Sequence, residues 1–273
     1  MKKGSISTII LILVFLVGLS LLLYPTVSDY WNSLHQSRVI TEYAEQVADL
    51  DDDRYEQLWQ DAETYNRSLL TKADRYELSD EERTEYESLL NVSGSGIIGY
   101  IEIPSIKCSL PIYHGTDEAV LQIAVGHIEG TSLPVGGEST HCVLSGHRGL
   151  PSARLFTDLD KLTDGDTFIL RILDETLTYE VDQIRIVEPD EMAELEIEEG
   201  RDYCTLVTCT PYGINTHRLL VRGHRVENQA EAKTIRVTAD AMQIEPVIVA
   251  PMVAVPMLLV LLAALLISTR RKK

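Results

Sequence analysis

The chain has 273 residues, enough for one core domain with accessory segments. It carries 42 acidic and 24 basic residues, and its formal net charge is −18. This excess of negative charge argues against a nucleic acid as partner, because binding to phosphates requires clustered lysine and arginine. Lys2, Lys3 and the four residues at 270–273 place cations at both ends of the chain, next to its two most apolar runs.

The first apolar run, Ile6 to Tyr24, is long enough to cross a membrane core of about 30 Å at about 1.5 Å per helical residue. We therefore expect residues 1–27 to form an N-terminal membrane anchor. A cleaved signal peptide is the alternative, because two lysines before an apolar core fit that pattern too. No small-x-small cleavage site follows Leu23, and this favours the uncleaved anchor.

The second apolar run, Val247 to Ile267, precedes the four C-terminal cations. Prolines interrupt its first half, which membrane helices tolerate better than helices in water. The run predicts a C-terminal transmembrane helix over 246–268, followed by a cytoplasmic basic tail over 269–273. Because positive residues stay on the cytoplasmic side, we expect both termini inside the cell and the region between the two spans outside.

Residues 28–92 are charged, and their apolar positions recur at three- and four-residue steps. This periodicity predicts two amphipathic helices interrupted at Asp51 to Asp53. Ser93 to Gly96 is a short flexible linker and marks a boundary. We expect a helical segment over 28–92, a separate domain over 93–228 and a juxtamembrane linker over 229–245.

Beyond the linker, short β-type runs alternate with Gly, Pro, Asn and Asp, which indicates a closed or nearly closed β-barrel. The expected strands are Ile97–Ile103, Ser109–Tyr113, Cys142–Leu144, Thr167–Ile172, Leu177–Ile186, Tyr203–Cys209 and Arg218–Arg225. Short helices are expected at Glu118–Ala124 and Ala153–Leu159.

Two motifs in this domain point to chemistry. Cys209 ends the run T-L-V-T-C, the chain then turns at a Pro and a Gly, and a second run begins at Arg218. Such a hairpin would hold a thiol and a guanidinium close together. His147 lies in S-G-H-R-G, after an apolar pair, as expected for a strand that runs into a tight loop.

Acyl transfer by a cysteine requires a thiolate, a proton donor for the leaving amine and a positive group for the oxyanion. Cys209, His147 and Arg218 are the candidates for these three roles. Arg222 stays open as a rival to Arg218, because both side chains lie on one face of the strand. We expect no metal, since there is no C-x-x-C or H-x-x-x-H pair, and the chemistry requires no cofactor.

Four cysteines in an external domain raise the question of disulfides. Cys204 and Cys209 are an odd number of positions apart, so in one strand they face opposite sides and cannot pair. A bridge between Cys108 and Cys142 stays open. We expect Cys108, Cys142 and Cys204 to be reduced core residues and only Cys209 to be used chemically.

The same residues resemble a known family. T-L-V-T-C at 205–209, T-P-Y-G-I-N-T-H-R at 210–218 and S-G-H-R-G at 145–149 are similar to motifs of the sortases, membrane-anchored cysteine transpeptidases of Gram-positive bacteria. The longer match, from G-Y-I-E-I-P at 99–104 to the Arg-Gly pair at 222–223, is similar to class C, the pilin-polymerising branch. The resemblance implies a mainly β fold: a sortase-type β-barrel with an N-terminal helical segment and two transmembrane helices.

By this resemblance, Cys209, His147 and Arg218 are catalytic. The thiol would cleave an LPxTG-type sorting signal between Thr and Gly, and an amine would resolve the resulting thioester. In class C the amine is a lysine of the next pilin; in the alternative, attachment of surface proteins to the cell wall, it belongs to a peptidoglycan precursor. A third hypothesis, a non-catalytic membrane scaffold, predicts that the three residues are dispensable.

Class C relatives also carry a lid over the active-site cleft, with an Asp-Pro-aromatic motif. Residues 72–90 occupy its place here, and Asp74-Arg75-Tyr76 keeps the acid and the aromatic but lacks the proline. Losing proline frees the backbone angle, so we expect a looser lid. Asp74 and Tyr76 are carried over as lid residues near the catalytic cysteine; the alternative is a charged loop between helices.

Overall fold

The structure is a computed structural model that describes residues 3–228. Residues 29–228 lie in one compact unit, and the residues before Asp29 belong to a second one. The linker expected over 229–245, the transmembrane helix expected over 246–268 and the basic tail over 269–273 lie outside the described residues.

Helix α1 spans Lys3–Ala48 and continues through Pro25. From Leu11 onward it contains a window that is long and apolar enough to cross a membrane, and none of the residues in that window is buried within the protein. Among the described residues it is the one helix with these properties. A single helix therefore runs through the boundary expected at residue 27, because the chain after Pro25 contains no further helix-breaking residue.

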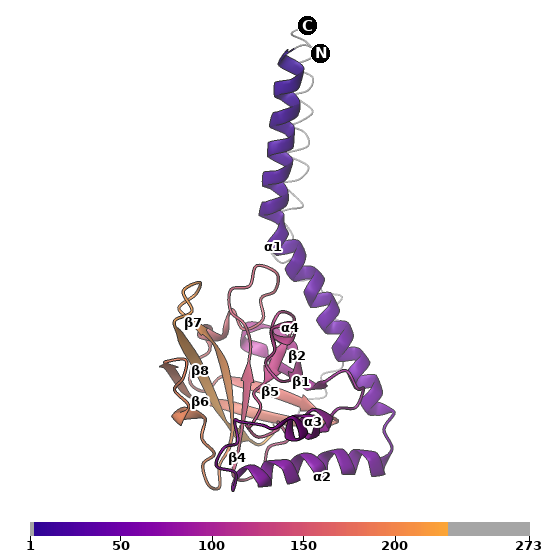
Figure 1. Cartoon of the computed structure of the whole chain (residues 1–273), viewed down its shortest axis with the longest axis vertical. Helices are drawn as coiled ribbons and strands as arrows, with labels where there is room; N and C mark the ends of the chain where they lie inside the picture. Colours follow the sequence, from indigo (N-terminus) through magenta and orange to yellow (C-terminus); the bar gives the residue numbers. More distant parts are fainter. Residues whose placement is uncertain (1–2, 229–273) are drawn as a thin grey trace. The chain divides into compact units, whose positions relative to one another are not determined.

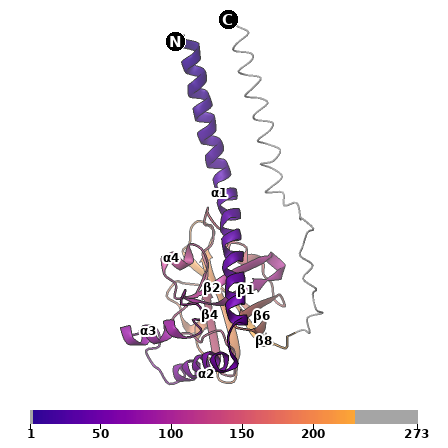
Figure 2. The same ribbon diagram turned by 90° about the vertical axis from the view of Figure 1, so that its right-hand side faces the viewer.

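Two shorter helices follow. Helix α2 spans Asp52–Leu69, and Asp51 caps it by accepting a hydrogen bond from the Arg54 amide at 2.7 Å. The acidic interruption expected here is thus a helix start. Helix α3 spans Asp80–Ser88 and begins with a capping box. The two helices lie beside each other (Figures 1 and 2), and the Tyr65 and Tyr86 ring centroids are 6.0 Å apart.

The strands expected from the sequence close into a barrel, so this part of the predicted fold is confirmed (Figure 1). Its strand order is β1-β2-β3-β4-β7-β8-β6-β5. The strands are β1 Ile97–Ile103, β2 Cys108–His114, β3 Val125–His127, β4 Thr140–Ser145, β5 Thr167–Ile172, β6 Glu175–Val187, β7 Asp202–Thr210 and β8 His217–Val226. The β2/β3 and β4/β7 pairs are parallel, and the other pairs are antiparallel.

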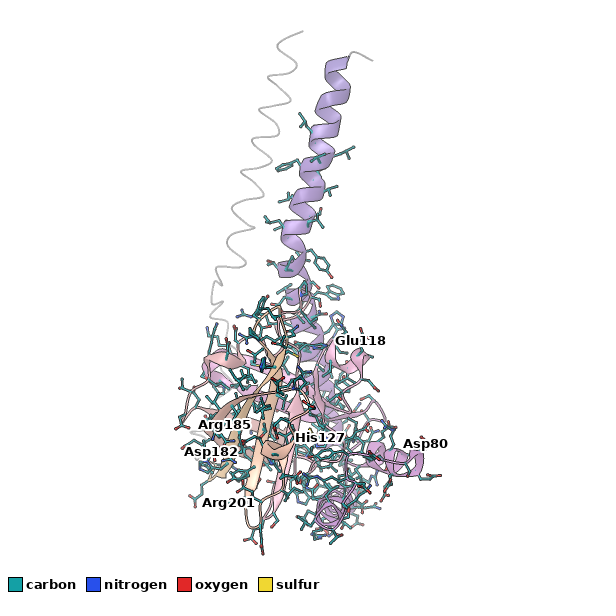
Figure 3. All side chains as sticks on the ribbon, turned by 60° about the vertical axis from the view of Figure 1, so that its left-hand side comes forward. Asp80, Glu118, His127, Asp182, Arg185 and Arg201 are labelled. Atoms are coloured by element: carbon teal, nitrogen blue, oxygen red, sulfur yellow. The ribbon has the colours of Figure 1, made fainter. Side chains whose placement is uncertain are left out.

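The core fills the barrel interior with alternate residues of each strand, as the twofold periodicity of a strand requires. Phe168 and Tyr179 stack there with centroids 5.5 Å apart. A Cβ on Gly223 would lie 2.7 Å from the Phe168 ring, so this pair approaches the backbone of β8 closely. In Figure 3, His127 on β3 lies between Asp80, at the start of α3, and Asp182 on β6.

Three local expectations differ from the structure. Strand β3 was not expected, because it has only three residues. Helix α4 covers only Glu118–Leu121, less than the expected 118–124. The helix expected at Ala153–Leu159 is wrong: turns lead there into a 3-10 helix η2 at Leu159–Lys161. Phe156 is fully buried in the barrel core, and this packing overrides the local helical pattern.

All four cysteines are free thiols in the structure. Cys142 on β4 and Cys204 on β7 are directly opposite each other across the two parallel strands, and both are buried. Cys108 is half-buried near the carbonyl oxygen of Leu155, and burial raises the pKa of its thiol to about 12. Cys142 and Cys204 lie away from solvent, whereas Cys209, at the end of β7, is half-buried like Cys108.

Candidate active site

Three neighbouring strands bring the expected catalytic residues to one place. Strands β4 and β7 run parallel with Ser145 aligned to Val207, and β7 and β8 run antiparallel with Cys209 aligned to Arg218. Neighbouring strands are about 4.8 Å apart. Cys209 lies two residues after Val207 on β7, and His147 lies two residues beyond Ser145, where β4 ends. The structure therefore groups His147, Cys209 and Arg218 at one end of the sheet.

The backbone around His147 is held from both sides. The Gly146 amide donates to the carbonyl oxygen of Val207 at 3.0 Å, and the Thr208 hydroxyl donates to the carbonyl oxygen of Gly146 at 2.7 Å. On the other side, the Phe156 amide donates to the carbonyl oxygen of His147 at 3.1 Å. These bonds tie the histidine loop to β7, the strand that carries the cysteine.

An apolar surface extends from the thiol along the same face of the sheet. Val207 shares its face with Cys209, and Leu220 shares its face with Arg218. These two side chains pack with Val143 and with Leu195 of the 3-10 helix η3, Ala193–Leu195. We call the four residues Val143, Leu195, Val207 and Leu220 the apolar floor. All four are at most 7% exposed, so the apolar floor is a buried cluster on the face of the sheet that carries Cys209.

The charge of Arg218 is not neutralised by a carboxylate within residues 3–228. Its guanidinium donates to the carbonyl oxygens of Asn215 and His217 at 3.5 and 3.2 Å. Because backbone carbonyl oxygens carry no net charge, the positive charge of Arg218 stays available to stabilise an oxyanion.

Arg222, the rival cation, is engaged elsewhere. It pairs with Asp182 at 3.0 Å and lies over the Tyr203 ring, 4.1 Å from the centroid. It is aligned with Thr205, four residues before Cys209, or about 13 Å along the strand. Of the two arginines on this face, Arg218 is thus the one beside the thiol.

A further arginine supports the site from the opposite side of the sheet. Arg148 is almost fully buried, forms an ion pair with Asp160, and donates to the Thr210 hydroxyl at 3.3 Å. It directly follows His147, and Thr210 directly follows Cys209, so one guanidinium links the segments that carry these two expected catalytic residues. Sequence reasoning assigned no role to Arg148, although it is part of S-G-H-R-G. No local pattern points to Asp160.

The expected lid residues lie in a turn between α2 and α3. Asp74 is exposed and Tyr76 is half-buried. Within the described part of the chain, no hydrogen bond or ion pair links either residue to the expected catalytic residues. Arg75, the residue between them, fixes the turn to the barrel: it is only 6% exposed, and it pairs with Glu196 at 2.9 Å.

Two further contacts fix this turn against the barrel. The Arg75 guanidinium donates to the carbonyl oxygen of Leu195 at 3.3 Å, and Leu195 belongs to the apolar floor. A Cβ on Gly130 would overlap the carbonyl oxygen of Arg75, so the turn lies directly on the β3–β4 connection. The segment therefore contacts both connections that flank the apolar floor. Sequence reasoning missed Arg75 because its partner Glu196 is 121 positions away.

Comparisons with known proteins show the family to which this fold belongs. A family model for the sortase domain matches residues 101–226. The crystal structure of sortase C1 from Streptococcus agalactiae is 54% identical and has a TM-score of 0.68, covering 70% of this chain and 99% of that chain. The chain belongs to the sortase family. Members of this family are cysteine transpeptidases, and the solved neighbours of this sortase are sortase C enzymes, so the class C resemblance is confirmed.

Another solved relative is Clostridium perfringens sortase C, whose structure includes the C-terminal cell wall sorting motif. It is 48% identical with a TM-score of 0.63, covering 70% of this sortase and 100% of that chain. Among curated proteins, sortase D of Bacillus subtilis is 33% identical over 131 residues. That match covers 47% of this sortase and 63% of sortase D, so the similarity spans less than two thirds of the relative.

Proposed function

We propose that this sortase is a membrane-anchored transpeptidase that cleaves LPxTG-type sorting signals through a thioester on Cys209 and joins them to a pilin lysine. The observation that supports this most strongly is the register that aligns Cys209 on β7 with Arg218 on β8, with His147 two residues beyond the end of β4, the other neighbour of β7. The Clostridium perfringens relative with its sorting motif supports the substrate class.

The reaction follows from the positions of these three groups. The thiolate of Cys209 attacks the threonine carbonyl, and Arg218 stabilises the oxyanion that forms. His147 gives a proton to the departing glycine amine, which leaves the acyl group as a thioester. An incoming amine then attacks the thioester carbonyl and gives its proton to His147, and Cys209 leaves as thiolate. The products are a new amide bond and the original enzyme.

The apolar floor is proposed to receive the leucine and proline of the signal. Its four side chains lie on the face that carries Cys209, and because they are at most 7% exposed, a peptide would contact them only after the covering segment moves away. A peptide that extends from the thiol along β7 would reach them within two residues, since strand neighbours on one face are about 6.6 Å apart.

Residues 72–90 are proposed to act as a lid over this floor, with Asp74 and Tyr76 in the covering turn. Support comes from Arg75, whose contacts with Leu195 and Glu196 bring the turn to the far end of the floor. A cover that excludes water would favour attack by an amine over hydrolysis of the thioester.

We further propose that α1 is the N-terminal anchor, that the catalytic domain lies outside the cell and that both termini are cytoplasmic. The apolar window of α1 and the basic residues at the chain ends support this topology. The second anchor over 246–268 and the role in pilus assembly belong to the same proposal. Attachment of surface proteins to peptidoglycan is the competing function.

The first test is intact-mass analysis of the full chain in detergent after incubation with an LPxTG peptide. We expect an acyl adduct that is absent from Cys209→Ala. Arg218→Ala and Arg222→Ala form a matched pair, and only the first should abolish adduct formation. An adduct that persists in Cys209→Ala would disprove the assignment of the nucleophile.

The amine is identified in a second step. The thioester is offered either a folded pilin domain from the same bacterium or a peptidoglycan cross-bridge peptide. A covalent product with the pilin lysine supports pilus assembly. Transfer to the cross-bridge peptide alone would instead establish cell-wall attachment.

A further inference from the structure

One face of α1 binds the catalytic domain through polar side chains. Asp29, Asn32 and Gln36 are three and four residues apart and therefore lie on one side of the helix. All three are half-buried, and the same face continues to the buried residues Tyr43 and Val47. This stripe is not explained by the membrane-spanning window or by the catalytic residues.

Each polar residue of the stripe binds a backbone group of the domain. Asn32 donates its side-chain amide to the carbonyl oxygen of Ser152 at 2.8 Å. Asp29 accepts a hydrogen bond from the amide of Arg154, also at 2.8 Å. Gln36 differs in its target, because it donates to the carbonyl oxygen of Ile123 at 2.7 Å, after helix α4.

The first two bonds both reach the loop that follows His147. This loop, residues 148–155, closes where the Phe156 amide binds the carbonyl oxygen of His147. Ala153 and Leu155 are buried in the barrel core, whereas Pro151 and Arg154 are exposed. The hydrogen bonds from Asp29 and Asn32 therefore add a polar attachment of the backbone on either side of Ala153.

We propose that Asp29 and Asn32 are positioning residues that fix the His147 loop and, through it, the imidazole relative to Cys209. The inference rests on the proposed catalytic role of His147. Proton transfer requires a donor and acceptor within about 3 Å, and a misplacement of about 1 Å can reduce a rate by about 10²-fold. Two bonds at the middle of the loop limit such a displacement.

The test uses the full chain in detergent micelles, an LPxTG peptide and an amine acceptor, with kcat and KM measured as a function of pH. We expect Asn32→Ala and Asp29→Ala each to lower kcat by about fivefold, the effect of about one hydrogen bond, with KM for the peptide unchanged. The pH profile of kcat should also shift, because the surroundings of the imidazole change.

Conservative variants separate positioning from general stability. Asp29→Asn keeps an acceptor for the Arg154 amide and should retain wild-type kcat, whereas Asn32→Asp loses the donor and should behave like Asn32→Ala. Gln36→Ala is the matched control, because it removes a bond of similar length from the same stripe without touching the His147 loop. It should leave kcat and the pH profile unchanged.

Hydrogen exchange provides a readout that does not depend on activity. Amides 148–155 should exchange faster in Asn32→Ala than in the wild type or in Gln36→Ala. If kcat, the pH profile and exchange are unchanged in the Asp29 and Asn32 variants while His147→Ala is inactive, the inference is overturned and the proposed function stands. Equal losses in Gln36→Ala would also overturn it, because they would show a general docking effect. Full activity of His147→Ala would instead refute the proposed function, and the inference with it.

Discussion

Replacing Glu196 by alanine removes the charged partner that holds Arg75 and the turn around it. The guanidinium is 8% exposed and the carboxylate 61% exposed, so solvent weakens the pair from one side only. An exposed ion pair contributes about 0.2–1 kcal/mol and a hydrogen bond to a charged group about 1.5–3 kcal/mol. Because the carboxylate is largely solvated, we expect a loss of about 1 kcal/mol, with the Arg75 bond to Leu195 retained.

A loss of about 1 kcal/mol shifts an equilibrium between closed and open lid by about fivefold. If the closed form dominates, the open fraction and the rate of thioester formation at low peptide concentration rise by the same factor. Quenched-flow sampling with intact-mass detection measures this rate directly. Arg75→Ala, which removes all of the guanidinium contacts, should increase the rate further. The control is Glu63→Ala, which removes an exposed pair with Arg67 on α2 and should change nothing.

The lid hypothesis fails if both variants form the thioester at the wild-type rate while their melting temperatures fall. That result would show that the turn stabilises the fold without limiting access to Cys209. A slower rate in Glu196→Ala would also refute the reasoning, because it would show that the closed arrangement promotes the reaction.

Three further changes test the fold around the site. Burial, with a smaller contribution from His127, lowers the pKa of His114 to about 4 from 6.5. As the pH falls, the unfolded chain therefore binds a proton before the folded chain does, and the free energy of unfolding should fall by up to about 3 kcal/mol between pH 6.5 and pH 4. Urea titrations measure this fall, which should be smaller for His114→Gln. Gly146→Ala would place a Cβ 2.6 Å from the Phe156 ring. We expect a loss of about 1–3 kcal/mol in the unfolding free energy and a lower transpeptidation rate. Wild-type values of both would contradict the close packing. Asn66 is buried and binds both the amide and the carbonyl of Leu133, at 2.7 and 3.1 Å. Asn66→Ala should lower the free energy of unfolding by about 2–3 kcal/mol, measured by thermal unfolding. An unchanged melting temperature would show that other groups replace these bonds.

Local sequence patterns were sufficient to predict most strands of the barrel. The bounds of β1 and β5 match the predicted runs residue for residue, because alternating apolar side chains and flanking turn residues define these strands locally. The end of α1 and helix α2 were also foreseen from their periodicity, with an interruption at Asp51 to Asp53, whereas α3 was not expected. In each case the signal lies within the element itself.

Elements defined by distant partners were not foreseen. The three residues of β3 form a strand only because β2 and β4 lie on either side of them. The segment around Phe156 is not helical because its aromatic ring enters the barrel core, although its local pattern suggests a helix.

For the site, the sequence by itself was enough to propose Cys209, His147 and Arg218 as catalytic residues, since each lies in a recognisable motif. The tertiary structure decided how they are arranged and what holds them. The register of β7 and β8 separates Arg218 from Arg222, and the contacts of Arg75, Arg148 and Asn32 join segments distant in the chain. The physical reason is that strand pairing and long-range hydrogen bonds depend on which segments meet in space, and local sequence patterns do not specify these meetings.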